Sequence, residues 1–214
     1  MATKVDSAEG VLDRFSAKKE LLVSYEENLS EADTRCKIID VLFKDVLGWN
    51  ERNITREEYS KGEKIGYVDY WFKSNSNSFI LEAKKKGIYF NVPTSSRRVR
   101  TSGVLSRDKN CRKALEQAAA YCRNNGVKVG GITNGLQLIV FAVDELDADY
   151  DAYIFNGIDC FEDDIINLIN LFDPYADATS ALKNILENQG TGIRNIPQYS
   201  RRISEAIFNY DAKI

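Results

Sequence analysis

The sequence predicts an α/β fold, in which helices lie on both sides of a small mixed sheet. The chain has 214 residues, 43% of them apolar and 29% charged, which is enough to form a proper hydrophobic core. Apolar side chains recur at helical spacing in the first 48 residues, then alternate as in strands, and later return to helical spacing. The resulting order of helices and strands favours a sheet that is covered on both faces.

The first part of the chain predicts two helices. One spans residues 8–28. The second begins at Ser30, which can cap it, has Asp33 in the capping-box position and ends at Gly48. Its expected buried stripe consists of Ile38, Ile39, Leu42, Phe43, Val46 and Leu47.

Three strands are predicted next, at about 54–59, 64–74 and 78–84, with the turn SNSN between the last two. Residues 85–107 predict a long loop because they contain Pro93 and a stretch rich in Ser and Thr.

The second half begins with a helix that Asp108 caps and Gly126 ends. Two strands joined at Asn134-Gly135 follow, and this dipeptide is a strong hairpin signal. From residue 162 to about 188 the pattern is helical.

We therefore expect one domain over residues 1–188. It has a core at about 30–143 and a helical extension at about 160–188, and residues 189–214 form a connector or a short helical tail.

Composition excludes several classes of protein. The chain contains no histidine, so Ser-His-Asp hydrolases, Cys-His proteases and H-E-x-x-H metalloproteases are ruled out. Its four cysteines contain no C-x-x-C pair, which predicts reduced, buried thiols in place of a zinc site. The amino terminus lacks the features of a signal peptide, and the run LIVFAV is too short to span a membrane. These features predict a cytoplasmic protein with no membrane partner.

Two carboxylates interrupt neighbouring strands. Glu82 and Lys84 share one face of the strand ILEAK, while Asp69 lies within the preceding strand, between Val68 and Tyr70. If the two strands form a hairpin, Asp69 and Glu82 lie close together and need a compensating cation. Mg²⁺ takes oxygen ligands and keeps waters that a phosphate can displace, so it suits this pair. Beside two acids, Lys84 is expected to be an ammonium that positions water or stabilises developing negative charge.

This pattern resembles the metal site of the PD-(D/E)xK nuclease superfamily. Further motifs resemble the amino-terminal nuclease domain of type I restriction enzyme R subunits, over about residues 30–143. They are SEADTRCKIIDVLFKDVLGW, GYVDY, ILEAKKKG, QAAAY and GITNGLQLIVF, in this order.

The resemblance implies a restriction-endonuclease-like fold, a three-layer α/β/α core, and cleavage of DNA that depends on Mg²⁺, for which Mn²⁺ could substitute. It implies that Asp69 and Glu82 hold the metal, that Lys84 completes the catalytic set, and that Gln117 and Tyr121 support DNA binding. It also points to bacterial or archaeal defence against foreign DNA.

Glu31 has two interpretations. It falls on the apolar side of its helix, and in the related nucleases a glutamate on this helix often joins the metal site, which makes Glu31 a candidate third ligand. Alternatively it stabilises the helix amino terminus, with Arg35 as its ion-pair partner.

The chain departs from the R-subunit pattern in two ways. The segment between Lys84 and Gln117 is longer than usual, and there is neither a P-loop nor room for helicase domains. The sequence therefore leaves two questions open: whether a further domain or subunit supplies specificity or activation, and whether the chain forms a homodimer.

A basic segment begins at the proposed site. Residues 84–113 contain ten cations and one acid, a net charge of +9 in a chain of −3, whereas residues 129–182 contain eleven acids and no Lys or Arg. We expect the basic loop to bind DNA phosphates without reading bases. Its proposed contacts are Lys85, Lys86, Arg97, Arg98 and Arg100. The acidic run DELDADYDAY lacks the Gly and Glu of an EF-hand loop and predicts a solvated loop or a partner surface.

The sequence therefore predicts a Mg²⁺-dependent deoxyribonuclease. A noncatalytic nucleic-acid-binding or assembly module is the alternative, and a ribonuclease on the same scaffold is a third candidate.

Overall fold

The protein is an α/β structure built on one seven-stranded sheet. The computed structural model describes residues 7–25, 29–93, 97–143 and 149–189. The strands are β1 (Ile54–Ser60), β2 (Gly66–Lys73), β3 (Ser78–Ala83), β4 (Arg98–Arg100), β5 (Val129–Thr133), β6 (Gln137–Ala142) and β7 (Asp151–Asn156).

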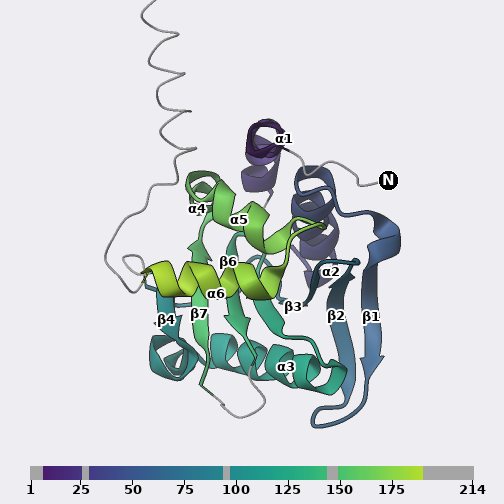
Figure 1. Ribbon diagram of the computed structural model, residues 1–214, viewed down its shortest axis with the longest axis vertical. Helices are drawn as coiled ribbons and strands as arrows, with labels where there is room; N and C mark the ends of the chain where they lie inside the picture. Colours follow the sequence, from purple (N-terminus) through teal and green to yellow (C-terminus); the bar gives the residue numbers. More distant parts are fainter. Residues whose placement is uncertain (1–6, 26–28, 94–96, 144–148, 190–214) are drawn as a thin grey trace, which may run out of the picture.

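The strand order is β1-β2-β3-β5-β6-β7-β4, so β1 and β4 form the two edges of the sheet (Figure 1). Neighbours are antiparallel except β3 and β5, which are parallel. The sheet is therefore mixed, as predicted.

Helices cover both faces of the sheet, and side chains along β3, β6 and β7 alternate between two hydrophobic clusters. In β3, Phe79 and Leu81 belong to one cluster and Ile80 to the other. The first cluster takes in α1 (Ala8–Ser24), η1 (Arg35–Ile39), η2 (Val41–Val46), α4 (Ile158–Asp163), α5 (Ile165–Phe172) and α6 (Ala178–Gln189). The second takes in η4 (Thr101–Leu105) and α3 (Lys109–Asn125).

The predicted helix ends are confirmed where capping residues define them. Ser30 caps the short helix α2 (Glu31–Thr34) by accepting a hydrogen bond from the Asp33 amide, and the chain continues through the π-helical segments η1 and η2 up to Gly48, whose φ is 79°. Asp108 caps α3 in the same way. A left-handed Gly126 ends α3.

Two strands were missed by sequence reasoning, so the sheet is larger than predicted. β4 lies inside the predicted long loop 85–107, and β7 takes up the end of the acidic run. Residues 94–96 and 144–148, which belong to these two segments, lie outside the described residues.

The carboxyl-terminal helices α4, α5 and α6 confirm the helical extension, which begins at Ile158, four residues earlier than the predicted helical pattern. The connector predicted for 189–214 lies outside the described residues apart from Gln189, the last residue of α6. None of the helices in the described ranges has the length and apolar character needed to cross a membrane.

The prediction of buried thiols is correct for two cysteines only. All four cysteines are unpaired, and Cys111 and Cys122 are buried, but Cys36 is exposed and Cys160 is half-buried.

Candidate functional site

The β2–β3 hairpin brings Asp69 and Glu82 together, as the sequence predicts. Tyr70 is paired with Leu81 in the register, so Asp69 and Glu82 are the next residues toward the same end of the two strands. One Asp69 oxygen, Oδ2, accepts a hydrogen bond from the Ala83 amide at 2.8 Å. The Asp69 carboxylate is thereby fixed against the backbone of the strand that carries Glu82.

Glu82 is buried and incompletely bonded. Its side chain is 2% exposed, and Oε1 accepts a hydrogen bond from Nζ of Lys84 at 2.5 Å, but Oε2 has no partner in the described structure. Burial, and then the charge of Asp69, raise the pKa of Glu82 to about 8 even though Lys84 opposes the shift. At neutral pH this carboxyl group therefore favours a proton unless another cation replaces it.

Lys84 directly follows β3. Its amide donates to the carbonyl of Thr133 at 2.8 Å, which continues the parallel pairing with β5. Burial alone would lower the pKa of Lys84, but the charge and hydrogen bond of Glu82, together with the charges of Asp69 and Glu31, more than offset this, so the pKa lies above its ordinary value. Lys84 is thus an ammonium and not a general base, as expected from its two acidic neighbours.

Arg35 pairs with Asp69 and not with Glu31, so the predicted Arg35–Glu31 pair is wrong. Arg35 therefore belongs to the same cluster of charged side chains as Asp69, Glu82 and Lys84. Its guanidinium lies 3.2 Å from Oδ1 of Asp69 and 2.7 Å from Oε1 of Glu57. Glu57 has a left-handed φ of 56°, which is uncommon for a residue with a side chain. It lies between the register pairs Arg56–Tyr70 and Glu58–Val68, which places it opposite Asp69.

Sequence reasoning missed Glu57, and a strand pattern alone carries no signal of its backbone conformation. The π-helical turn that presents Arg35 was equally hidden, although such turns are frequent at functional sites.

Gln117 and Tyr121 approach the carboxylates from α3, which packs on β3 and β5. Nε2 of Gln117 donates to the Tyr121 hydroxyl at 3.4 Å. Burial and the nearby charge of Glu82 raise the pKa of Tyr121, so its phenol stays protonated. A Cβ added to Gly66 would lie 2.3 Å from this hydroxyl, so only glycine lets the tyrosine approach β2 this closely.

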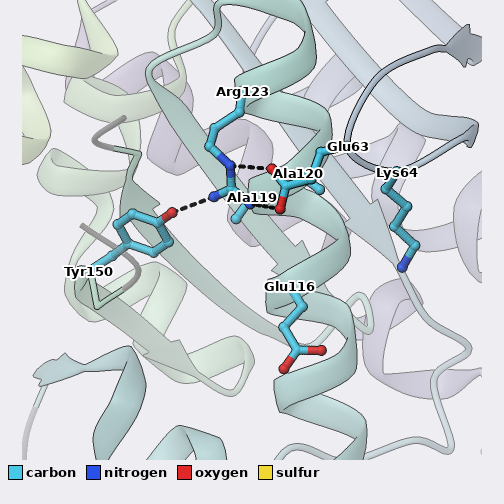
Figure 2. Close-up of a pocket in the computed structure, with 7 residues that line it drawn as sticks. All are labelled: Glu63, Lys64, Glu116, Ala119, Ala120, Arg123 and Tyr150. Carbon is cyan, nitrogen blue, oxygen red and sulfur yellow. Dashed lines mark hydrogen bonds and ion pairs between the residues drawn. The ribbon is translucent and has the colours of Figure 1, made fainter. Parts of the chain in front are cut away.

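An ion pair holds the β1–β2 hairpin against α3. The Arg123 guanidinium binds both oxygens of Glu63 at 2.7 Å and also donates to the hydroxyl of Tyr150 (Figure 2). A cavity of about 440 Å³ adjoins this ion pair, lined by Glu63, Lys64, Glu116, Ala119, Ala120, Arg123 and Tyr150. None of the proposed catalytic side chains lines it, and Arg123 is already bonded there. We therefore assign the ion pair between Glu63 and Arg123 a structural role, which is to keep Gly66 against Tyr121.

Glu31 stands near the cluster without completing it. It is exposed in the first turn of α2, yet its charge contributes to the raised pKa values of Glu82 and Lys84. Among the described residues, no three Asp, Glu, Cys or His side chains form a ready metal-binding group. The ligand set of Asp69, Glu82 and Glu31 stays a prediction.

The cluster still fits a hard divalent ion. Mg²⁺ is commonly held by one or two carboxylates while waters and substrate phosphates complete its shell. Asp69 and Glu82 would supply the two carboxylates, and Oε2 of Glu82, which has no hydrogen-bond partner in the described structure, has the chemistry of an oxygen ligand.

The two lysines after Lys84 behave differently from each other. Lys85 is exposed. Lys86 is only 4% exposed, and its Nζ donates to the carbonyl of Tyr25 while its amide donates to the Thr34 hydroxyl. The prediction that Lys86 contacts DNA is therefore wrong for this structure, because its ammonium is used inside the protein.

The predicted contact arginines do not adjoin the carboxylates. They lie at β4, four strand positions from β3, which corresponds to about 19 Å at the usual strand spacing. Arg97 lies 2.7 Å from Asp164, Arg98 lies 3.1 Å from Asp151, and Arg100 lies 3.5 Å from Asp149. The predicted basic segment is thus divided in space, because acidic side chains from the second half of the chain pair with its arginines.

Comparisons of the chain with protein-family models, with curated proteins and with solved structures gave no match. The resemblance to type I restriction enzyme R subunits stays a prediction from the sequence motifs.

Proposed function

We propose that this protein is a Mg²⁺-dependent deoxyribonuclease that hydrolyses phosphodiester bonds, as part of defence against foreign DNA. One observation carries the proposal. A buried carboxylate, Glu82, lies beside Asp69 and Lys84 with one oxygen unbonded in the described structure. Buried polar groups are nearly always paired, so an orphan oxygen of this kind needs an explanation, and the second carboxylate beside it favours a bound cation.

Each side chain at the site has a separate role in this proposal. Asp69 and Glu82 would hold the ion, which when bound polarises the phosphate and activates a water. The Lys84 ammonium, fixed by Glu82, stabilises negative charge that develops on the phosphate. Gln117 and Tyr121 offer an amide and a phenol at the same site for the DNA strand.

Arg35 has a supporting role in this proposal. Its guanidinium bridges the carboxylates of Asp69 and Glu57. It is therefore a positioning residue, because it holds Asp69 in place while the Ala83 amide orients the other oxygen.

A noncatalytic nucleic-acid-binding module is the second candidate, and a specific observation favours it. Arg35 already compensates Asp69, and the described residues contain no ready group of three metal ligands. A ribonuclease is the third candidate, since the same carboxylates would act on a phosphate in either polymer.

Cleavage of supercoiled plasmid separates these candidates. Wild type, Glu82→Gln and Lys84→Met are each incubated with plasmid and with a single-stranded RNA, with and without Mg²⁺. Asp164→Asn serves as the matched control, because it alters a half-buried acid that is already paired with Arg97. The proposal predicts metal-dependent DNA cleavage by wild type and Asp164→Asn only. DNA binding without cleavage by any variant would support the binding module, and cleavage of RNA alone would support the ribonuclease.

A further inference from the structure

Arg35 joins two carboxylates that differ in their surroundings. Its Nη1 donates to Oδ1 of Asp69 at 3.2 Å, and its Nη2 donates to Oε1 of Glu57 at 2.7 Å. The side chain of Asp69 is 14% exposed, whereas that of Glu57 is 63% exposed. Because the two contacts use different nitrogens, the guanidinium can release one carboxylate and keep the other.

Oδ1 is the Asp69 oxygen that a metal ion would take. The other oxygen, Oδ2, is held by the Ala83 amide at 2.8 Å. Among the described residues, Arg35 is the only hydrogen-bond donor to Oδ1. The ion and the guanidinium of Arg35 are therefore drawn to the same oxygen.

Charge opposes the sharing of this oxygen. A guanidinium stays protonated, so Arg35 cannot reduce its repulsion of a divalent ion by losing a proton, as a lysine can. The side chains of Arg35 and Asp69 are only 17% and 14% exposed, and water and salt screen charges weakly at such positions. We therefore expect a divalent ion at Asp69 to move the guanidinium away from it.

The backbone of Glu57 supplies a second acceptor for Arg35. Glu57 is the one non-glycine residue with a positive φ in the described part of the chain. This conformation is unfavourable for a residue with a Cβ, and residues of this kind cluster at functional and switch sites. Burial does not compensate for it, since the side chain is exposed. The contact with Arg35 is the one ion pair that this strained residue makes among the described residues.

We infer that Arg35 is a placeholder cation, which competes with Mg²⁺ for Oδ1 of Asp69 and is retained by Glu57 when the ion binds. This inference rests on the proposed function and adds how the same site is regulated. In the metal-free protein Arg35 holds Asp69, and the ion takes over this carboxylate.

Calorimetric titration with Mg²⁺ in the absence of DNA tests the competition without a need for cleavage. The proteins compared are wild type, Arg35→Met, Glu57→Gln and the double variant Arg35→Met/Glu57→Gln. Arg56→Met and Glu58→Gln are the matched controls. Arg56 is 24% exposed and pairs with Asp40 and Glu51, and Glu58 is exposed beside Glu57 on β1. Each control removes a similar charge nearby but leaves the contact between Arg35 and Asp69 in place.

We expect Arg35→Met to bind Mg²⁺ about tenfold more tightly than wild type, and Arg56→Met to change the affinity by less than about threefold. Mg²⁺ should accordingly raise the Tm of Arg35→Met by more than it raises that of wild type. An affinity of Arg35→Met equal to or below that of wild type would overturn the inference, because the guanidinium would then only position Asp69. An equal gain for Arg56→Met would also overturn it, since any nearby positive charge would then have the same effect.

The double variant tests the part that Glu57 plays. Glu57→Gln should weaken Mg²⁺ binding by about threefold or more in the wild-type background, because Arg35 then has no other carboxylate to move to. In the Arg35→Met background, Glu57→Gln should have no larger effect than Glu58→Gln. Equal effects of Glu57→Gln in both backgrounds would overturn the role of Glu57 as the second acceptor.

Nitrogen-15 NMR of wild type covers the case in which Arg35→Met does not fold. The Nε–H signal of Arg35 is assigned from its absence in Arg35→Lys. We expect this signal to shift during a Mg²⁺ titration, with the same midpoint as the calorimetric curve. A signal that stays unchanged at saturating Mg²⁺ would overturn the inference.

The result is separable from that of the proposed function. Mg²⁺ binding by wild type that Arg35→Met does not tighten would leave the nuclease standing and overturn the placeholder. Binding by Arg35→Met but not by wild type would support the placeholder and overturn the nuclease. Binding by neither protein, even with uncleavable DNA present, would overturn both.

Discussion

Two clusters of acids and bases lie at distant positions of the sheet, and they differ in how completely they are paired. At β4 and β7, each of Arg97, Arg98 and Arg100 has an acidic partner. At β2 and β3, Glu82 has one oxygen bonded to Lys84 and the other bonded to no described group. Paired charges explain how the edge of the sheet is held, whereas a buried acid with one oxygen unbonded is typical of a functional site, which we propose to be a cation site.

Removing the charge of Glu82 gives the largest effect that we expect. Glu82→Gln keeps the shape of the side chain and removes its charge, so DNA cleavage should fall more than about a hundredfold, since both metal binding and the placement of Lys84 are lost. Plasmid cleavage rates measure this. A variant that cleaves within a few-fold of wild type would contradict the role of Glu82.

Removing an acid that is fully paired should lower the stability of the protein and leave its cleavage rate unchanged. Asp164 accepts from Arg97 and from the hydroxyl of Tyr153, so Asp164→Asn should cost about 1–3 kcal/mol in the free energy of unfolding. Cleavage per folded molecule should be unchanged. Urea unfolding, monitored beside the plasmid assay, checks both outcomes, and a loss of cleavage without a loss of stability would erase the contrast between the two clusters.

The pH dependence of stability also separates the two clusters. The pKa of Glu82 is raised to about 8 in the folded protein, so below its unfolded pKa near 4.5 both states hold the proton. Between these values the folded state binds the proton more tightly, and the contribution of Glu82 to stability falls by about 1.4 kcal/mol for each pH unit. Thermal unfolding of the metal-free protein from pH 5 to 8 should show this fall. Glu82→Gln should lack it, whereas Asp164→Asn should keep it.

We expect the smallest effect from substitution of the basic side chains that follow Lys84. Lys85 is exposed, so Lys85→Ala should weaken DNA binding and reduce the slope of log affinity against log salt by about 1. Lys86 is buried, and Lys86→Met should leave that slope unchanged while it lowers stability. Salt titrations of binding by anisotropy compare them, and an equal change in slope for both variants would refute the assignment of Lys86 to the interior.

The part of the site that lies on one hairpin could be predicted from sequence. Asp69, Glu82 and Lys84 lie on strands joined by a short turn, so the register of the hairpin fixes their proximity. The capped helix α3 likewise follows from Asp108 and Gly126.

The remainder depends on long-range packing that no local pattern records. The three-residue strand β4 is too short to show alternation, and its pairing with β7 is what gives the arginines their acidic partners. The contact of Arg35 with Glu57 needs both a π-helical turn and a left-handed residue within a strand. Neither of these has a sequence signature.

Calorimetric titration with Mg²⁺ at pH 8, for wild type and Glu82→Gln, tests the central claim most directly, because it asks whether the orphan carboxylate oxygen is a metal ligand. We predict that wild type binds one ion and that Glu82→Gln binds none under the same conditions. Equal binding by the two proteins, or no binding by wild type even with uncleavable DNA present, would contradict the account.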